Sequence, residues 1–155
     1  MWKQLTQKAQ KAVFLALEEA GKLGYSHVGP EHLLLALVRE EDCLAARILE
    51  RVGVDLGTVR SEIMKRLSRG SETLSDGLEL TAEAKHVIDL AFDESRQAKE
   101  EWIGTEHLLI GLAEEPHSIA AQFLAEHGID AALIRRELRS MQAGVLPFGQ
   151  NSGGK

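Results

Sequence analysis

The residues of this chain that could do chemistry most readily are an adjacent glutamate and histidine that occur twice, as Glu31-His32 and Glu106-His107. Adjacent side chains on a helix point about 100° apart, so neither pair is a ready-made acid and base. The six histidines are scattered, and no two have the i, i+4 spacing with an intervening glutamate that is typical of a zinc-peptidase helix. We therefore expect no catalytic residue, no metal site and no cofactor, and the chain is predicted not to be an enzyme.

Two threonines, Thr6 and Thr81, precede helical patterns and are N-cap candidates worth about 1 kcal/mol each. Glu31 and Glu106 fall in first helical turns, where a carboxylate stabilises the helix dipole by about 0.3–1 kcal/mol. These structural roles alone would explain why threonine and glutamate occur at these positions. The alternative is recognition: free N–H groups at a capped helix start suit a phosphate, and a nearby carboxylate suits a guanidinium. The histidines that follow the glutamates are interpreted as packed first-turn residues.

The elements that must position these residues form an internal repeat. The stretch 28–37 recurs without a gap at 103–112, 75 positions later, and the same offset aligns about a third of roughly sixty positions as identities. We predict one repeat at 1–68, a linker rich in serine and glycine at 69–79, a second repeat at 80–141 and a flexible tail at 142–155.

Each repeat shows four stretches of helical periodicity. In the first repeat Thr6 begins a helix that Gly24 ends, Pro30 opens a second that ends near residue 40, residues 43–52 form a third, and Asp55 caps a fourth. The second repeat follows the same order, and no alternating pattern of a strand is present. The prediction is an all-α fold of two tandem, pseudo-twofold four-helix repeats that form one bundle domain.

Composition excludes several function classes. The chain of 155 residues is 44% hydrophobic and 27% charged, and no apolar run approaches the roughly 20 residues of a membrane span. Residues 1–75 carry 11 basic and 10 acidic side chains and residues 76–155 carry 7 and 14, so a nucleic-acid partner is not expected. No signal peptide is recognisable and the single Cys43 has a small apolar setting, so a cytoplasmic protein without a membrane partner is predicted.

The doubled Gly-[Pro/Thr]-Glu-His-Leu-Leu motif, the Leu-Ala-Ala and Ile-Ala-Ala helices, the start at Thr81-Ala82-Glu83 and the 75-residue period resemble the N-terminal double-repeat domain of the Clp AAA+ unfoldases, and are most similar to the ClpC type. The resemblance covers about residues 2–141. It implies a domain that receives protein substrates and adaptor proteins of the MecA or McsB kind. These would pass to a Clp ATPase ring and its peptidase in a full-length protein. The isolated domain is expected to be monomeric.

The resemblance also implies ligand residues. In ClpC-like domains each repeat holds one phosphoarginine, with the motif glutamate on the guanidinium and the helix-start threonine near the phosphate. Carried over, the sites are Glu31 with Thr6 and Glu106 with Thr81, lined by Val28 and Ile103 respectively. A further surface for adaptors and cyclic-peptide inhibitors would include Trp2, Lys85 and Asp89.

This chain departs from the family pattern at three places. Pro30 stands where the second copy has Thr105, which removes a hydroxyl and an N–H near the first site, and acidic turns at 40–43 and 114–117 replace glycine-rich ones. Acids that face a pocket would weaken phosphate binding. The alternatives are a free-standing adaptor-like protein, a binder of adaptors or exposed apolar segments without phosphoarginine recognition, and a purely structural scaffold.

Overall fold

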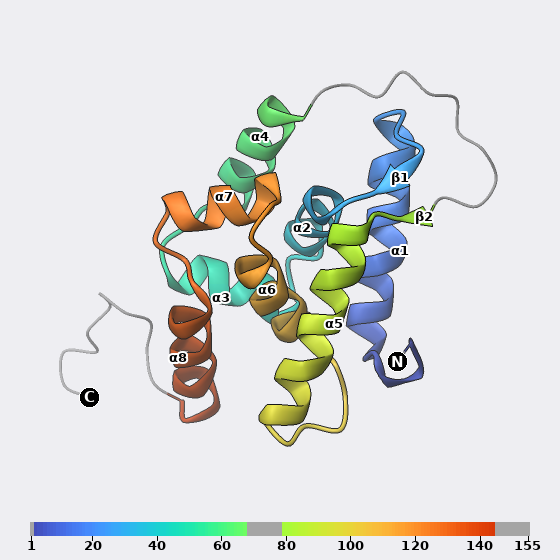
Figure 1. Cartoon of the computed structure of the whole chain (residues 1–155). Helices are drawn as coiled ribbons and strands as arrows, with labels where there is room; N and C mark the ends of the chain where they lie inside the picture. Colours follow the sequence, from blue (N-terminus) through green and yellow to red (C-terminus); the bar gives the residue numbers. More distant parts are fainter. Residues whose placement is uncertain (1, 68–78, 145–155) are drawn as a thin grey trace.

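Within residues 2–67 and 79–144, which the computed structural model describes, the chain forms eight α-helices and two very short strands (Figure 1). The first repeat contains α1 (Gln7–Lys22), α2 (Pro30–Arg39), α3 (Leu44–Arg51) and α4 (Leu56–Arg66), preceded by the one-turn 3-10 helix η1 (Trp2–Gln4). The second repeat contains α5 (Ala82–Gln97), α6 (Thr105–Glu114), α7 (Ile119–Glu126) and α8 (Ala131–Gln142). The predicted all-α fold with four helices in each repeat is confirmed.

The helix ends follow local chemistry. Asp55 accepts a hydrogen bond from the Thr58 amide at 3.0 Å at the start of α4, and Asp130 accepts one from the Leu133 amide at 2.9 Å at the start of α8. Gly24, just beyond α1, has φ of 79°, a left-handed conformation that glycine adopts without strain. The caps and the terminator that the sequence predicts are therefore present.

The two strands were missed by sequence reasoning. β1 (His27–Val28) pairs in parallel with β2 (Glu79–Leu80), and an isolated parallel bridge joins Leu5 to Ile103. These pairings are equivalent, because adding 75 to Leu5 gives Leu80 and adding 75 to Val28 gives Ile103. Two residues are too few to show alternation. Glu79, which was predicted to belong to the linker, lies in β2. Residues 69–78 of the predicted linker and the tail from residue 145 onward are outside the described residues.

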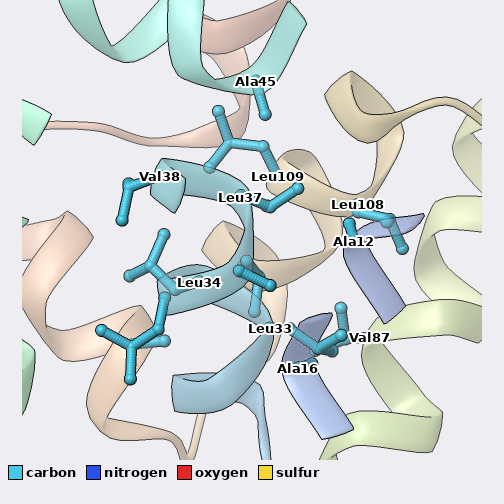
Figure 2. Close-up of a cluster of buried hydrophobic side chains, with 14 of the residues drawn as sticks. Ala12, Ala16, Leu33, Leu34, Leu37, Val38, Ala45, Val87, Leu108 and Leu109 are labelled. Atoms are coloured by element: carbon cyan, nitrogen blue, oxygen red, sulfur yellow. The ribbon is translucent and has the colours of Figure 1, made fainter. Parts of the chain in front are cut away.

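The core is built around α2 and α6. Every residue from Leu33 to Val38 is at most 5% exposed, and α6 is buried almost as completely. Figure 2 shows Leu33, Leu34 and Leu37 of α2 among Leu108 and Leu109 of α6, with alanines of α1 alongside. Their apolar runs predict this burial, since a helix that is apolar on all sides must be surrounded by other helices.

The third helix of each repeat packs against the other repeat. Helix α3 contacts α6 and α8, while α7 contacts α2 and α4. Within each repeat, a buried glutamate of the first helix holds an arginine of the fourth: Glu19 with Arg60 at 3.0 Å, and Glu94 with Arg135 at 2.7 Å. An ion pair thus links the first and fourth helices within each repeat, and the third helices contact the opposite repeat.

Candidate functional site

The threonine caps lie at the starts of the two longest helices. Thr6 Oγ1 accepts a hydrogen bond from the Ala9 amide at 3.1 Å, and Thr81 Oγ1 accepts one from the Ala84 amide at 3.0 Å. Helices α1 and α5 have 16 residues each, so each start carries unpaired N–H groups and the positive end of a helix dipole. The capping role that the sequence predicts for both threonines is confirmed.

The structure corrects the pairing of threonines with glutamates. The Thr6 amide donates to the carbonyl oxygen of Ile103 at 3.0 Å, and the Thr81 amide donates to the carbonyl oxygen of Val28 at 2.9 Å. Each threonine thus lies beside the motif of the other repeat. The predicted pairs, Glu31 with Thr6 and Glu106 with Thr81, are wrong.

The physical reason is the direction of the first helix. With 16 residues at about 1.5 Å each, α1 carries the chain about 24 Å from Thr6 before the motif of the same repeat begins. Figure 1 shows β1 and the start of α1 at opposite ends of that helix. We name the two resulting arrangements the Thr81–Glu31 site, made of Thr81, Val28, Gly29 and Glu31, and the Thr6–Glu106 site, made of Thr6, Ile103, Gly104 and Glu106.

The motif histidines have the structural place expected of them. The Gly29 amide donates to Nδ1 of His32 at 2.9 Å, and the Gly104 amide donates to Nδ1 of His107 at the same distance. Both histidines are 2% exposed. Burial lowers the pKa of His32 to about 4, so its ring is neutral at pH 7. Among the described residues no group of three or more His, Cys, Asp or Glu is placed to hold a metal ion.

Glu31 is held by helix α7 of the other repeat. Its Oε2 accepts a hydrogen bond from the Ile119 amide at 3.1 Å, and the Ala120 amide also stabilises the charged form. Its Oε1 lies over Gly29, 2.7 Å from where a Cβ on that glycine would be, and Thr81 Oγ1 is 3.9 Å from the same point. Burial, reinforced by the nearby Glu115, raises the pKa of Glu31 despite these amides.

Glu106 has a different environment. Its carboxylate also folds over its glycine, Gly104, but within the described part of the chain it makes no hydrogen bond or ion pair. The start of α3 is served instead by Thr105, whose Oγ1 accepts from the Ala45 amide at 3.2 Å. Cys43 completes that cap, with Sγ accepting from the Ala46 amide at 3.4 Å, and its side chain is buried.

Two further residues belong to the candidate sites: Thr105, whose role sequence reasoning missed, and Glu115, which lies in the acidic turn 114–117 that the sequence marks as unfavourable for phosphate binding. Both are buried, at 3% and 1% exposure, although neither belongs to an apolar stripe. For Thr105 the signal in the sequence is its difference from Pro30 in the aligned motif. Its consequence for Glu31 depends on where α7 lies, and that is a property of the tertiary fold.

The predicted adaptor surface is only partly described. Lys85 and Asp89 are exposed on α5, one turn apart. Trp2 belongs to η1, but its side chain lies outside the described part of the structure. Two other exposed aromatic residues were not predicted: Phe14 on α1, with 58% of its surface exposed, and Trp102, with 52%. No helix in the described ranges is long and apolar enough to span a bilayer.

Comparison with known proteins gives consistent matches. The Clp repeat N-terminal domain model matches residues 4–127 and 79–145. The chain is 40% identical over 141 residues to the ClpA homologue of Porphyra purpurea, an ATP-binding subunit of the Clp protease, covering 91% of this chain and 17% of that protein. It is 37% identical over 156 residues to ClpC/MecB of Bacillus subtilis (strain 168), covering 98% of this chain and 19% of that protein.

The solved structures agree on the fold. A ClpV N-domain in complex with a VipB peptide has a TM-score of 0.74 and 15% identity, covering 92% of this chain and 89% of that one. The chain therefore spans less than a fifth of the length of these two curated relatives, while it matches a solved N-domain over nearly its full length.

Proposed function

The chain belongs to the Clp repeat N-terminal domain family, and on that premise we propose that it is a non-catalytic docking domain that recognises arginine-phosphorylated proteins and adaptor proteins for a Clp-type unfoldase. The observation that carries the proposal is the crossed arrangement of the two repeats. Each capped helix start adjoins the motif of the other repeat, which carries a glutamate two residues beyond the glycine. A phosphate and a guanidinium in one ligand need these two features side by side.

The chemistry of the candidate sites fits this ligand class. A helix start of 16 residues attracts the phosphate through its amides and dipole, and a carboxylate forms paired, charge-assisted hydrogen bonds with a guanidinium. Neither feature alone would distinguish phosphoarginine from phosphoserine or from arginine. Together they select a group that bears both charges within a few ångströms.

Adaptor docking and capture of apolar segments is the second candidate function. It is favoured by the exposed rings of Phe14 and Trp102, since aromatic residues are enriched at protein interfaces. The ClpV N-domain solved with a VipB peptide also shows that a domain of this fold accommodates a peptide. In this second role the chain would serve an ATPase ring and peptidase of a longer protein without reading a phosphate.

The test is calorimetric titration of the domain with phosphoarginine, with arginine and with phosphoserine. The expected result is binding of phosphoarginine alone, lost in the double variant Glu31→Ala/Glu106→Ala. Circular dichroism of the double variant provides the control for folding. Absence of heat with phosphoarginine, in a wild-type protein that unfolds cooperatively, would refute phosphoarginine recognition and leave adaptor docking.

A further inference from the structure

The two candidate sites are related by the 75-residue offset, yet their carboxylates are engaged differently. Glu31 Oε2 accepts the Ile119 amide, the first amide of α7, at 3.1 Å, while Ser118 caps the same helix by accepting the Ala121 amide at 2.9 Å. The Glu106 carboxylate has no hydrogen bond or ion pair within the described ranges. A guanidinium that approached Glu31 would compete with backbone amides for the same carboxylate, whereas Glu106 is available.

The cause is a single substitution between the repeats. In the second repeat, the Thr105 hydroxyl serves the Ala45 amide at the start of α3. Its counterpart Pro30 has no hydroxyl, so the aligned Ala120 amide of α7 lacks that acceptor. Because buried amides without a partner cost free energy, Glu31 of the next position takes that role.

The charges at the starts of α1 and α5 also favour phosphate binding at the Thr6–Glu106 site. Helix α1 carries the exposed lysines Lys8 and Lys11, and the aligned positions on α5 are Glu83 and His86. Glu83 lies in the first turn of α5, where it already satisfies the positive end of the dipole and repels a phosphate.

Two charges partly offset this contrast. Lys85 of α5 aligns with the uncharged Gln10, and Asp42 pairs with Lys8 at 2.6 Å. Each site has a buried acid near it: Glu115 lies close to Glu31, and the aligned Glu40 lies close to Lys8 and Lys11. The buried acids therefore do not distinguish the two sites. The exposed Lys11 of α1 and the first-turn Glu83 of α5 therefore leave the Thr6–Glu106 site with the more favourable electrostatics for a phosphate.

Building on the proposed function, we propose that the two sites have diverged: the Thr6–Glu106 site binds phosphoarginine, and the Thr81–Glu31 site is a structural joint in which Glu31 accepts the first amides of α7 across the repeat boundary. The domain then takes one phosphoarginine, although its sequence contains two copies of the motif. Pro30 and Thr105 determine which copy keeps a free carboxylate.

The test is the stoichiometry of phosphoarginine binding by calorimetry, combined with thermal unfolding, for the wild type, Glu106→Ala, Glu31→Ala and Glu31→Gln. We expect one equivalent for the wild type. Glu106→Ala should weaken binding by roughly 10- to 100-fold, since it removes a charge-assisted pair, and leave the unfolding temperature unchanged. Glu31→Ala should lower the unfolding temperature by roughly 2–8 °C, because the first amides of α7 lose their acceptor, and should still bind one equivalent.

The conservative variant separates capping from ligand binding. Glu31→Gln keeps an oxygen that can accept the Ile119 amide, so it should recover most of the lost stability and bind one equivalent. Two equivalents in the wild type, or binding lost in Glu31→Gln, would overturn the divergence of the sites while leaving phosphoarginine recognition intact. A wild-type protein that is folded and binds no phosphoarginine would overturn both proposals together.

Discussion

His32 stabilises the start of α2 only while its ring is neutral. Its Nδ1 accepts the Gly29 amide, so the proton of the neutral ring is on Nε2, which is buried without a hydrogen-bond partner. The ring of Tyr25 packs against it edge-on, with centroids 4.8 Å apart. Protonation of Nδ1 would place two donors face to face and break the contact that shapes the start of α2.

His32 should therefore make stability depend on pH. Its pKa is about 4 in the folded state and about 6.5 when unfolded, so between these values the unfolded chain binds the extra proton. Stability is fully present above pH 6.5 and falls as the pH falls toward 4. At pH 4.5 the expected loss from this group is about 2–3 kcal/mol relative to pH 7.

Urea unfolding at pH 7 and pH 4.5, for the wild type and for His32→Gln, measures this loss. Glutamine can accept the Gly29 amide and does not titrate, so its loss between the two pH values should be smaller by that amount. Glu31 and Glu40 also have raised pKa values, but they are common to both proteins and cancel in the difference. Equal losses in the two proteins would contradict the assignment.

At the scale of elements, α5 and α6 approach each other at Gly111 more closely than any larger residue at that position would allow. A Cβ built on Gly111 of α6 would collide with the backbone carbonyl oxygen of Val87 on α5, and it would lie 3.2 Å from a Val87 methyl group. The aligned residue of α2 is Ala36, so only the second repeat depends on this contact. Glycine here serves packing and not a turn, since Gly111 lies inside a helix.

Gly111→Ala should consequently destabilise the domain, although alanine is the better helix former. Helix propensity favours alanine by about 1 kcal/mol, but a clash with backbone forces α5 and α6 apart and overpacking of this kind costs about 1–3 kcal/mol or more. Urea unfolding should show a net loss of about 1 kcal/mol or more. The matched control is Ser61→Ala, at an exposed position of α4, where no loss is expected. A more stable Gly111→Ala protein would refute the close contact.

At the scale of the whole molecule, the local features were predictable from sequence and the pairing of the repeats was not. Thr6, Asp55 and Gly24 mark their helix ends through chemistry within four residues, so the sequence suffices for them. Thr81 meets Val28 only because two strands of two residues pair in parallel, 52 positions apart in the register Val28 with Leu80. Local periodicity carries no information about such a contact.

The same limit applies to the candidate site. Pro30 and Thr105 were visibly different in the aligned motifs, but the sequence does not say which amides each side chain serves. That depends on α3 and α7, which pack on the opposite repeat. Residue types therefore identified the glutamates and threonines, whereas the crossed topology decides which of them act together.

This crossing predicts that neither repeat folds alone. Helices α2 and α4 of the first repeat contact α7, whose Phe123 has no exposed area, and the second repeat supplies Glu137, which is 3% exposed and accepts Arg51 Nε at 3.1 Å. Chains 1–72 and 73–155, expressed separately, should lack cooperative thermal unfolding by circular dichroism because each exposes the buried faces of α2 or α6.

The control is the full chain with a protease site inserted between the repeats. When it is cut after folding, the two halves should stay associated and unfold cooperatively, since the contacts across the boundary do not depend on the connection. Cooperative unfolding of either separate half would show that the repeats are independent domains. The contacts at the crossed sites would then not be required for folding.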